Sequence, residues 1–234
     1  MKSLPKLTIA GAIVALAHNV NAAELEISVQ NLTHGIYFTP LLITSHSNEV
    51  QLFNVAETAS SELQAMAEGG AIDGLMALAS GAGADNLANP AGGLLSPGQI
   101  AQGMLSTSEG NTQLSLVGMM LPTNDGFVGL NSWTLPTEPG TYHVYLNAYD
   151  AGTEANDEIR GGGAPGTPGM PVPPPLEPML GMGGSGVTSS IENTTVHIHP
   201  GNIGDDEAVA GQSDVSNTVH RWLNPVAKLT VTVQ

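Results

Sequence analysis

Residues 141–154 read TYHVYLNAYDAGTE, and this stretch decides the fold class. Apolar or aromatic residues recur at positions 142, 144 and 146, which is the period of a half-buried β-strand. The strand pattern then runs directly into a glycine-containing acidic turn that holds Asp150 and Glu154. The stretch therefore predicts a strand that carries two carboxylates at its end.

Other segments extend this pattern into a mainly β chain. Further strands are predicted over residues 24–31, 36–44, 112–121, 194–199 and 226–234. Pro40 interrupts the second of these, as expected of an edge strand or a bulge. We therefore expect an antiparallel β-sandwich that forms one domain over residues 23–234.

Two further features interrupt the strands. Residues 60–78 show a helical period that Gly69-Gly70 breaks, with a second short helix expected over residues 72–79 and a loop over residues 81–93. Sixteen of the 26 residues between 161 and 186 are Gly or Pro. That composition predicts a long mobile loop, which also contains three methionines.

The first residues read as a secretory signal peptide, residues 1–22. Lys2 and Lys6 precede an apolar run over residues 7–17, which is too short to span a bilayer, and small residues follow at a cleavage site. No second apolar run reaches transmembrane length. We therefore expect an exported protein in the periplasm, at the cell surface or outside the cell.

The charge balance excludes some partners. The chain has 5 basic and 21 acidic residues, a formal net charge of -16. Removing Lys2 and Lys6 leaves 3 − 21 = −18 for the processed chain. Nucleic acid and anionic membranes need a basic surface, so neither is an expected partner. The expected partner is an extracellular ligand or surface component that the sequence does not name.

Cysteine and enzyme motifs are both missing from the sequence. Without cysteine there is no disulfide, no thiolate metal site and no cysteine nucleophile. No Gly-x-Ser-x-Gly elbow, His-Glu-x-x-His helix or phosphate-binding glycine loop occurs. We therefore predict a protein that is not an enzyme and that is held together by its core or by a bound metal.

Two acidic loops follow predicted strands. One runs over residues 122–127 and contains Asp125, and the other runs over residues 150–158 and contains Asp150 and Glu154. Loops at one end of a sandwich can converge, and carboxylates on glycine-containing loops suit calcium. The three carboxylates form the predicted calcium site, with a solvated acidic turn as the alternative.

The same two loops carry a family resemblance. The run over residues 121–130, LPTNDGFVGL, and the run over residues 149–154, YDAGTE, resemble two signatures of the spondin N-terminal domain family. Similarity covers most of residues 24–160. The resemblance implies a β-sandwich similar to C2 domains and calcium held by Asp125, Asp150 and Glu154. Animal members usually have Asp where this chain has Glu154.

Histidines offer an alternative metal site. His197 and His199 lie two apart on a predicted strand, so their rings face the same side. Imidazole suits copper, and His143 on another strand is a candidate third ligand. An exposed polar strand face is the preferred explanation of the pair, with the metal site as the alternative. The two functional hypotheses are therefore a calcium-binding adhesion or binding module and a copper-binding surface or periplasmic protein.

Overall fold

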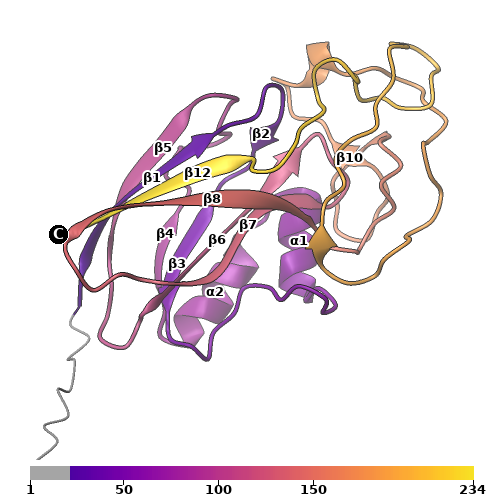
Figure 1. Ribbon diagram of the computed structural model, residues 1–234. Helices are drawn as coiled ribbons and strands as arrows, with labels where there is room; N and C mark the ends of the chain where they lie inside the picture. The colour runs from indigo at the N-terminus through magenta and orange to yellow at the C-terminus, as the bar shows by residue number, and fades with distance from the viewer. Residues whose placement is uncertain (1–21) are drawn as a thin grey trace, which may run out of the picture.

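The computed structural model describes residues 22–234, and one large antiparallel sheet dominates it (Figure 1). The predicted signal peptide lies outside the described residues, apart from residue 22. The strands of the large sheet are β1 (Glu24–Asn31), β2 (Tyr37–Phe38), β3 (Leu42–His46), β4 (Asp85–Ala88), β5 (Ile100–Ser106), β6 (Gln113–Leu121), β7 (Gly126–Thr134), β8 (Gly140–Asp150), β11 (His197–Ile198) and β12 (Ala227–Val233). The mainly β, antiparallel prediction is confirmed.

The sheet curls until its two ends meet. Its order is β4-β3-β6-β7-β8-β12-β1-β5, with β2 added beside β6 and β11 beside β8. The edge strands β4 and β5 approach so closely that a Cβ added at Gly103 would lie 2.8 Å from the Leu87 side chain. The sandwich is therefore nearly a closed barrel, which leaves little edge for pairing with another chain.

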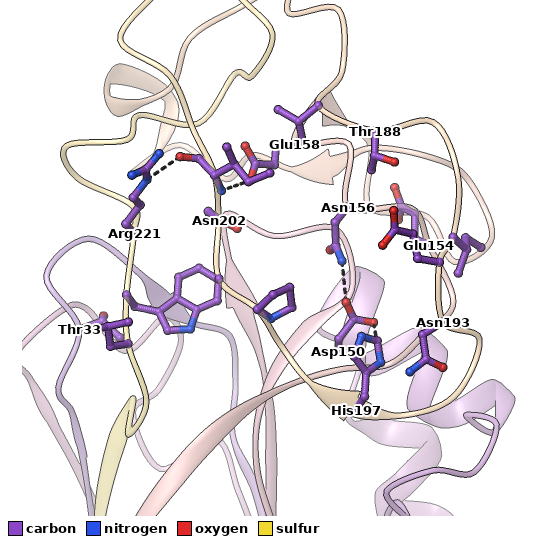
Figure 2. Close-up of a pocket in the computed structure, with 18 of the residues that line it drawn as sticks. Thr33, Asp150, Glu154, Asn156, Glu158, Thr188, Asn193, His197, Asn202 and Arg221 are labelled. Atoms are coloured by element: carbon purple, nitrogen blue, oxygen red, sulfur yellow. Dashed lines mark hydrogen bonds and ion pairs between the residues drawn. The ribbon is translucent and has the colours of Figure 1, made fainter.

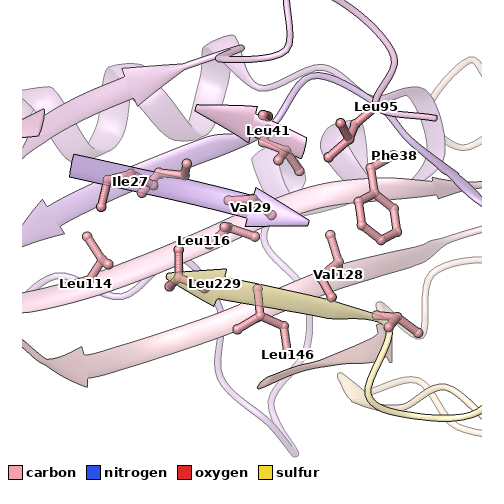
Figure 3. Packing of buried hydrophobic residues seen from close by; sticks show 14 of the residues in the cluster. Ile27, Val29, Phe38, Leu41, Leu95, Leu114, Leu116, Val128, Leu146 and Leu229 are labelled. Carbon is pink, nitrogen blue, oxygen red and sulfur yellow. The ribbon is translucent and has the colours of Figure 1, made fainter. Parts of the chain in front are cut away.

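The barrel interior holds the first hydrophobic core. Alternate residues of β1 and β12 point inward, and Val29 and Leu229 lie opposite each other in the antiparallel register (Figure 3). Leu116 of β6 and Leu146 of β8, the strand next to β12, belong to the same buried cluster. The period-two pattern seen in the sequence is thus the inward face of these strands.

Two helices cover the outside of the sheet at β3, β6 and β7. The first, α1 (Ser61–Gly69), begins at Ser60, whose side chain accepts from the Leu63 backbone N–H, and ends at Gly70 in the left-handed region. The second is α2 (Asp73–Gly81). They form a second core with the outer face of β6, so every residue of β6 is buried. The predicted helical insertion is confirmed.

Several predicted boundaries were wrong. Residues 81–93 were expected to be a loop, but they contain β4. No strand was predicted at β5 or β7, and the strand expected over residues 194–199 is only the two residues of β11. β5 and β7 each contain glycines that packing requires, and isolated glycines read as turns in a sequence.

The segment after β8 is irregular and lies at one end of the sheet (Figure 1). It contains only β9 (Arg160–Gly161), β10 (Met170–Pro171), a short helix (Glu177–Met179) and β11 before β12 begins. Residues 161–186 lack long regular elements, as predicted, but they are not a free loop. Met170 and Leu176 are fully buried, because this segment packs beside α1 and the outer core. In the described residues no helix is long and apolar enough to cross a membrane.

Candidate functional site

Three of the predicted site residues lie together at the ends of three neighbouring strands. In the register, Asp150 of β8 lies opposite Gly126 of β7 on one side and opposite His197 of β11 on the other. Asp125 directly precedes Gly126. The antiparallel pairing therefore places Asp125, Asp150 and His197 in one row across the sheet, at the end covered by the irregular segment.

Asp125 is fully buried, and its two oxygens differ. Its Oδ2 accepts from the Thr153 backbone N–H at 2.8 Å, the Thr153 hydroxyl at 3.2 Å and the Glu154 backbone N–H at 3.1 Å. Its Oδ1 is buried and has no hydrogen-bond partner among the described residues. A buried carboxylate oxygen without a donor is costly unless a proton or a cation reaches it.

The pKa of Asp125 also indicates that its carboxylate needs a proton or a cation. Burial, and then the nearby Asp150 carboxylate, raise the pKa of Asp125 from 3.8 to about 7. Asp150 itself is almost fully buried, and its oxygens accept from the Gly152 backbone N–H at 2.8 Å and from Asn156 Nδ2 at 2.6 Å. The two aspartates are therefore close enough to repel each other, and a cation between them would relieve that repulsion.

Glu154 does not join the two aspartates through its carboxylate. Its Oε1 accepts from Asn124 Nδ2 at 2.8 Å and from the Gly169 backbone N–H. Burial is the main cause that raises the pKa of Glu154, and Glu68 and Asp157 contribute as neighbouring carboxylates. Only the backbone N–H of Glu154 contacts Asp125. In residues 22–234 no three His, Asp or Glu side chains form a ready metal-binding group.

Asn124 connects the two acidic loops. Its Nδ2 donates to Glu154 Oε1 and to Asp157 Oδ1, each at 2.8 Å, while its Oδ1 accepts from the Glu158 backbone N–H at 3.1 Å. Asn124 lies inside the motif over residues 121–130, but no role was predicted for it. An Asn before the Asp is the only signal, and it does not reveal a contact with a loop about 30 residues away.

Glu158 was also missed as an anchor. Its Oε1 accepts from the Ile203 backbone N–H at 2.5 Å, and its Oε2 accepts from the Gly204 backbone N–H at 2.8 Å and the Ser213 hydroxyl at 2.6 Å. It adopts φ 59°, which is rare for a residue other than glycine. Glu158 therefore fixes the last irregular stretch, residues 200–222, against the acidic loop.

The structure separates His143 from the other two histidines of the copper hypothesis. His197 and His199 share one side of β11, as predicted, because residue 199 continues opposite Ala148. His143 lies on the other face of β8, paired with Thr230 and exposed. The strand alternation that makes residues 143 and 150 face opposite sides therefore keeps His143 away from the pair.

His199 is held in a form that does not suit a metal. Its Nδ1 accepts from the Gly201 backbone N–H at 3.0 Å, so the neutral ring carries its proton on Nε2. That Nε2 is buried without a partner, next to the Trp222 ring at 5.0 Å between centroids. Burial lowers the pKa of His199 to about 4, and His197 contributes in the same direction although Asp150 opposes it. A metal ligand needs a free lone pair instead.

A large pocket opens beside this row. Its volume is about 990 Å³, and Asp150, Glu154, Asn156 and His197 form one wall (Figure 2). We call it the Trp222 pocket, after the aromatic residue in its lining. No local sequence pattern shows that residues near 222 return to the acidic loops, so Trp222 was not predicted as a lining residue.

The fold and the site define an antiparallel β-sandwich module with buried carboxylates in its strand-end loops. Residues 30–168 match the sequence model of the Spondin_N family, so the chain belongs to the spondin N-terminal domain family. This confirms the resemblance carried by the two loops. The family is one of extracellular, adhesion-type modules. A comparison with curated proteins found no match.

Proposed function

We propose that this protein is a secreted or surface-exposed, non-catalytic binding module whose strand-end loops are stabilised by calcium. The observation that carries the proposal is the buried, unpartnered Oδ1 of Asp125 beside the Asp150 carboxylate. Hard oxygen donors suit calcium, and its flexible coordination accepts backbone carbonyls and waters beside carboxylates. Asp125 and Asp150 would hold the ion, which would supply positive charge and no reaction chemistry.

The residues fit a cation with two carboxylates rather than three. Glu154 joins the ion only if its side chain leaves Asn124 and the Gly169 backbone N–H. Its present contacts link the acidic loop to residues 161–186 instead. Calcium would therefore fix the ends of β7 and β8 directly, and Glu154 would fix the neighbouring irregular segment.

Support for the binding role comes from the family and from the placement of the site. The irregular segment lies at the end of the sheet that the ion would stabilise (Figure 1), and Asp150 itself lines the Trp222 pocket. The predicted signal peptide and the family agree on export. The copper alternative has less support, because His199 presents a protonated Nε2 and His143 lies on the opposite face.

The decisive experiment compares thermal unfolding in calcium and in EDTA. We expect wild-type protein to gain several degrees in calcium, and Asp150→Asn to lose that gain, because one charged ligand is removed. Asp206→Asn is the matched control, since Asp206 is exposed in the irregular segment and should keep the full response. A wild-type melting temperature that neither calcium nor EDTA changes would exclude the proposal.

A further inference from the structure

Polar side chains in the lining of the Trp222 pocket offer acceptors. Asn156 donates its Nδ2 to Asp150 at 2.6 Å, and Asn202 donates its Nδ2 to the Pro122 carbonyl at 2.9 Å and the His220 carbonyl at 3.4 Å. Within residues 22–234 no donor contacts the Oδ1 of either amide. The donating side of each amide is thus used inside the protein, which leaves the carbonyl side for a ligand.

His197 shows the same polarity. Its Nδ1 donates to the Thr195 carbonyl at 2.8 Å, so in the uncharged ring Nε2 is an acceptor. Three neutral side chains of this pocket, Asn156, Asn202 and His197, therefore present lone pairs. A ligand that contacts these three side chains must bring hydrogen-bond donors.

The charge of the pocket also selects the ligand. Among residues 22–234, four carboxylates line it (Asp150, Glu154, Glu158 and Glu192), and Arg221 is the one arginine or lysine in the lining. Arg221 is exposed, and its Nε already donates to the Ile203 carbonyl at 2.5 Å. Carboxylates within low-dielectric walls focus a negative potential, which repels anions and attracts cations.

The pocket lining also contains apolar side chains. Trp222 is half-buried, and Leu223 (90% exposed), Ile203 (59%) and Leu32 (42%) are exposed members of the same lining. These side chains offer apolar surface to the hydrocarbon stem of a ligand. The Trp222 ring also attracts a positive charge at close range. The apolar residues of the lining therefore suit a hydrocarbon stem, while its acceptors and carboxylates suit a charged donor.

From these observations we propose that the Trp222 pocket binds a primary alkylammonium group on an apolar stem, such as a small aliphatic amine or a lysine side chain. An ammonium group brings three donors and a positive charge to the acceptor wall, and its methylene stem covers Trp222 and Leu223. A bare metal ion satisfies the acceptors but leaves the apolar side exposed. The proposal does not depend on calcium, so its test is run in EDTA.

Isothermal titration calorimetry with pentylammonium, and with 1-pentanol as the neutral analogue of equal length, tests the proposal. We expect saturable binding of the amine, weakening with added salt, and at least about tenfold weaker binding of the alcohol. Nα-acetyl-lysinamide forms a separate arm. Binding of this compound as tight as that of pentylammonium identifies a lysine side chain as the source, and weaker binding identifies a free amine.

Variants of single pocket residues sharpen the test. Trp222→Ala should weaken amine binding about tenfold, and Trp222→Phe by less, because a ring remains. Glu192→Gln should weaken it about threefold, whereas Arg221→Gln should strengthen it, because the only like charge in the pocket is removed. A general loss of structure cannot weaken amine binding in Glu192→Gln and strengthen it in Arg221→Gln. These two variants therefore test the proposal even if Trp222→Ala fails to fold.

Either of two results would overturn the proposal. One is equal affinity for pentylammonium and 1-pentanol, which would make the pocket a merely apolar surface. The other is the absence of saturable amine binding to folded wild-type protein in EDTA. If the calcium response is absent but amine binding is retained, only the calcium proposal is contradicted. The calcium proposal and the amine proposal can therefore fail separately.

Discussion

At the scale of single residues, Asp125 shows how burial prepares a charge for a partner. Three donors hold its Oδ2, while its Oδ1 has none among the described residues, and Asp150 adds a second negative charge nearby. The sequence identified both aspartates because acidic residues after strands are visible as a motif. It did not show that Glu154 turns to Asn124, since side-chain direction depends on contacts between distant loops.

The raised pKa of Asp125 predicts how stability changes with pH when calcium is absent. The folded value is about 7 against 3.8 for an ordinary carboxyl, so the folded state holds this proton more tightly than the unfolded chain. Its contribution to the free energy of unfolding therefore falls as pH rises from about 4 to about 7. In EDTA at pH 8, Asp125→Asn should be more stable than wild type by on the order of 2 kcal/mol.

Urea unfolding at pH 4.5 and pH 8 measures this difference. Asp206→Asn is again the control, because it should behave as wild type at both pH values. A stability difference between Asp125→Asn and wild type that does not change with pH would show that Asp125 does not titrate as described. The variant should also have lost the response to calcium.

The buried His220 makes stability depend on pH with the opposite sign. Burial lowers the pKa of His220 to about 4 from 6.5, so the unfolded chain binds this proton more readily. Stability should therefore fall as pH drops from about 6.5 to about 4. His220→Asn should reduce that fall, because the titrating ring is removed. The Asn Oδ1 can replace Nδ1 as the acceptor for the Ser216 backbone N–H, which now lies at 3.1 Å. The measurement is urea unfolding across this pH range.

His143 supplies the matched control for this prediction. It is exposed on the outer face of the sheet, so His143→Asn should leave the pH dependence as in wild type. An identical acid response in wild type and His220→Asn would contradict the prediction.

At the scale of elements, regular patterns were readable and glycine-dependent packing was not. The strands β1, β8 and β12 and the capped helix α1 follow simple periods, so the sequence predicted them. Strand β7 was missed because Gly126 and Gly129 read as turn residues. A Cβ at Gly129 would lie 2.8 Å from the Tyr149 ring and 2.9 Å from the Phe53 ring. Close packing against aromatic rings from separate segments therefore requires a glycine at this position.

Gly152 allows a similar close approach inside the acidic loop. It adopts φ 70°, and a Cβ there would lie 2.7 Å from the Thr195 backbone nitrogen and 2.8 Å from the Asn193 carbonyl oxygen. Gly152→Ala should therefore cost about 3 kcal/mol or more in the free energy of unfolding. It should also weaken the calcium response, because the Gly152 backbone N–H donates to Asp150.

Gly83→Ala separates backbone strain from steric overlap. Gly83 has φ 81°, but nothing lies within 4 Å of an added Cβ. We expect a loss of only about 1 kcal/mol and an unchanged calcium response. Equal losses in the two variants, measured by urea unfolding, would mean that the contact between residue 152 and residues 193–195 is unimportant.

At the scale of the whole molecule, the chain closes its own barrel with its last strand. β12 pairs with β8 on one side and with β1 on the other, although about 75 residues separate it from β8. The family match ends at residue 168, before β12. Alternation predicted β12 as a strand, but no local signal predicted its central place, because strand order is decided by the packing of distant segments.

The central place of β12 predicts that the matched region alone does not fold. A chain of residues 22–168 would leave β1 and β8 without their shared neighbour and would open the interior core at Leu229 and Val231. Removing only residues 227–234 should have the same effect, because those residues contain the whole of β12. Both truncated chains should lose cooperative thermal unfolding and near-ultraviolet circular dichroism, whereas a chain lacking only Gln234 should retain them. Cooperative unfolding of the 22–168 chain would instead show that β1 and β8 can close the barrel directly, and that the irregular segment and β12 are additions to a smaller independent fold.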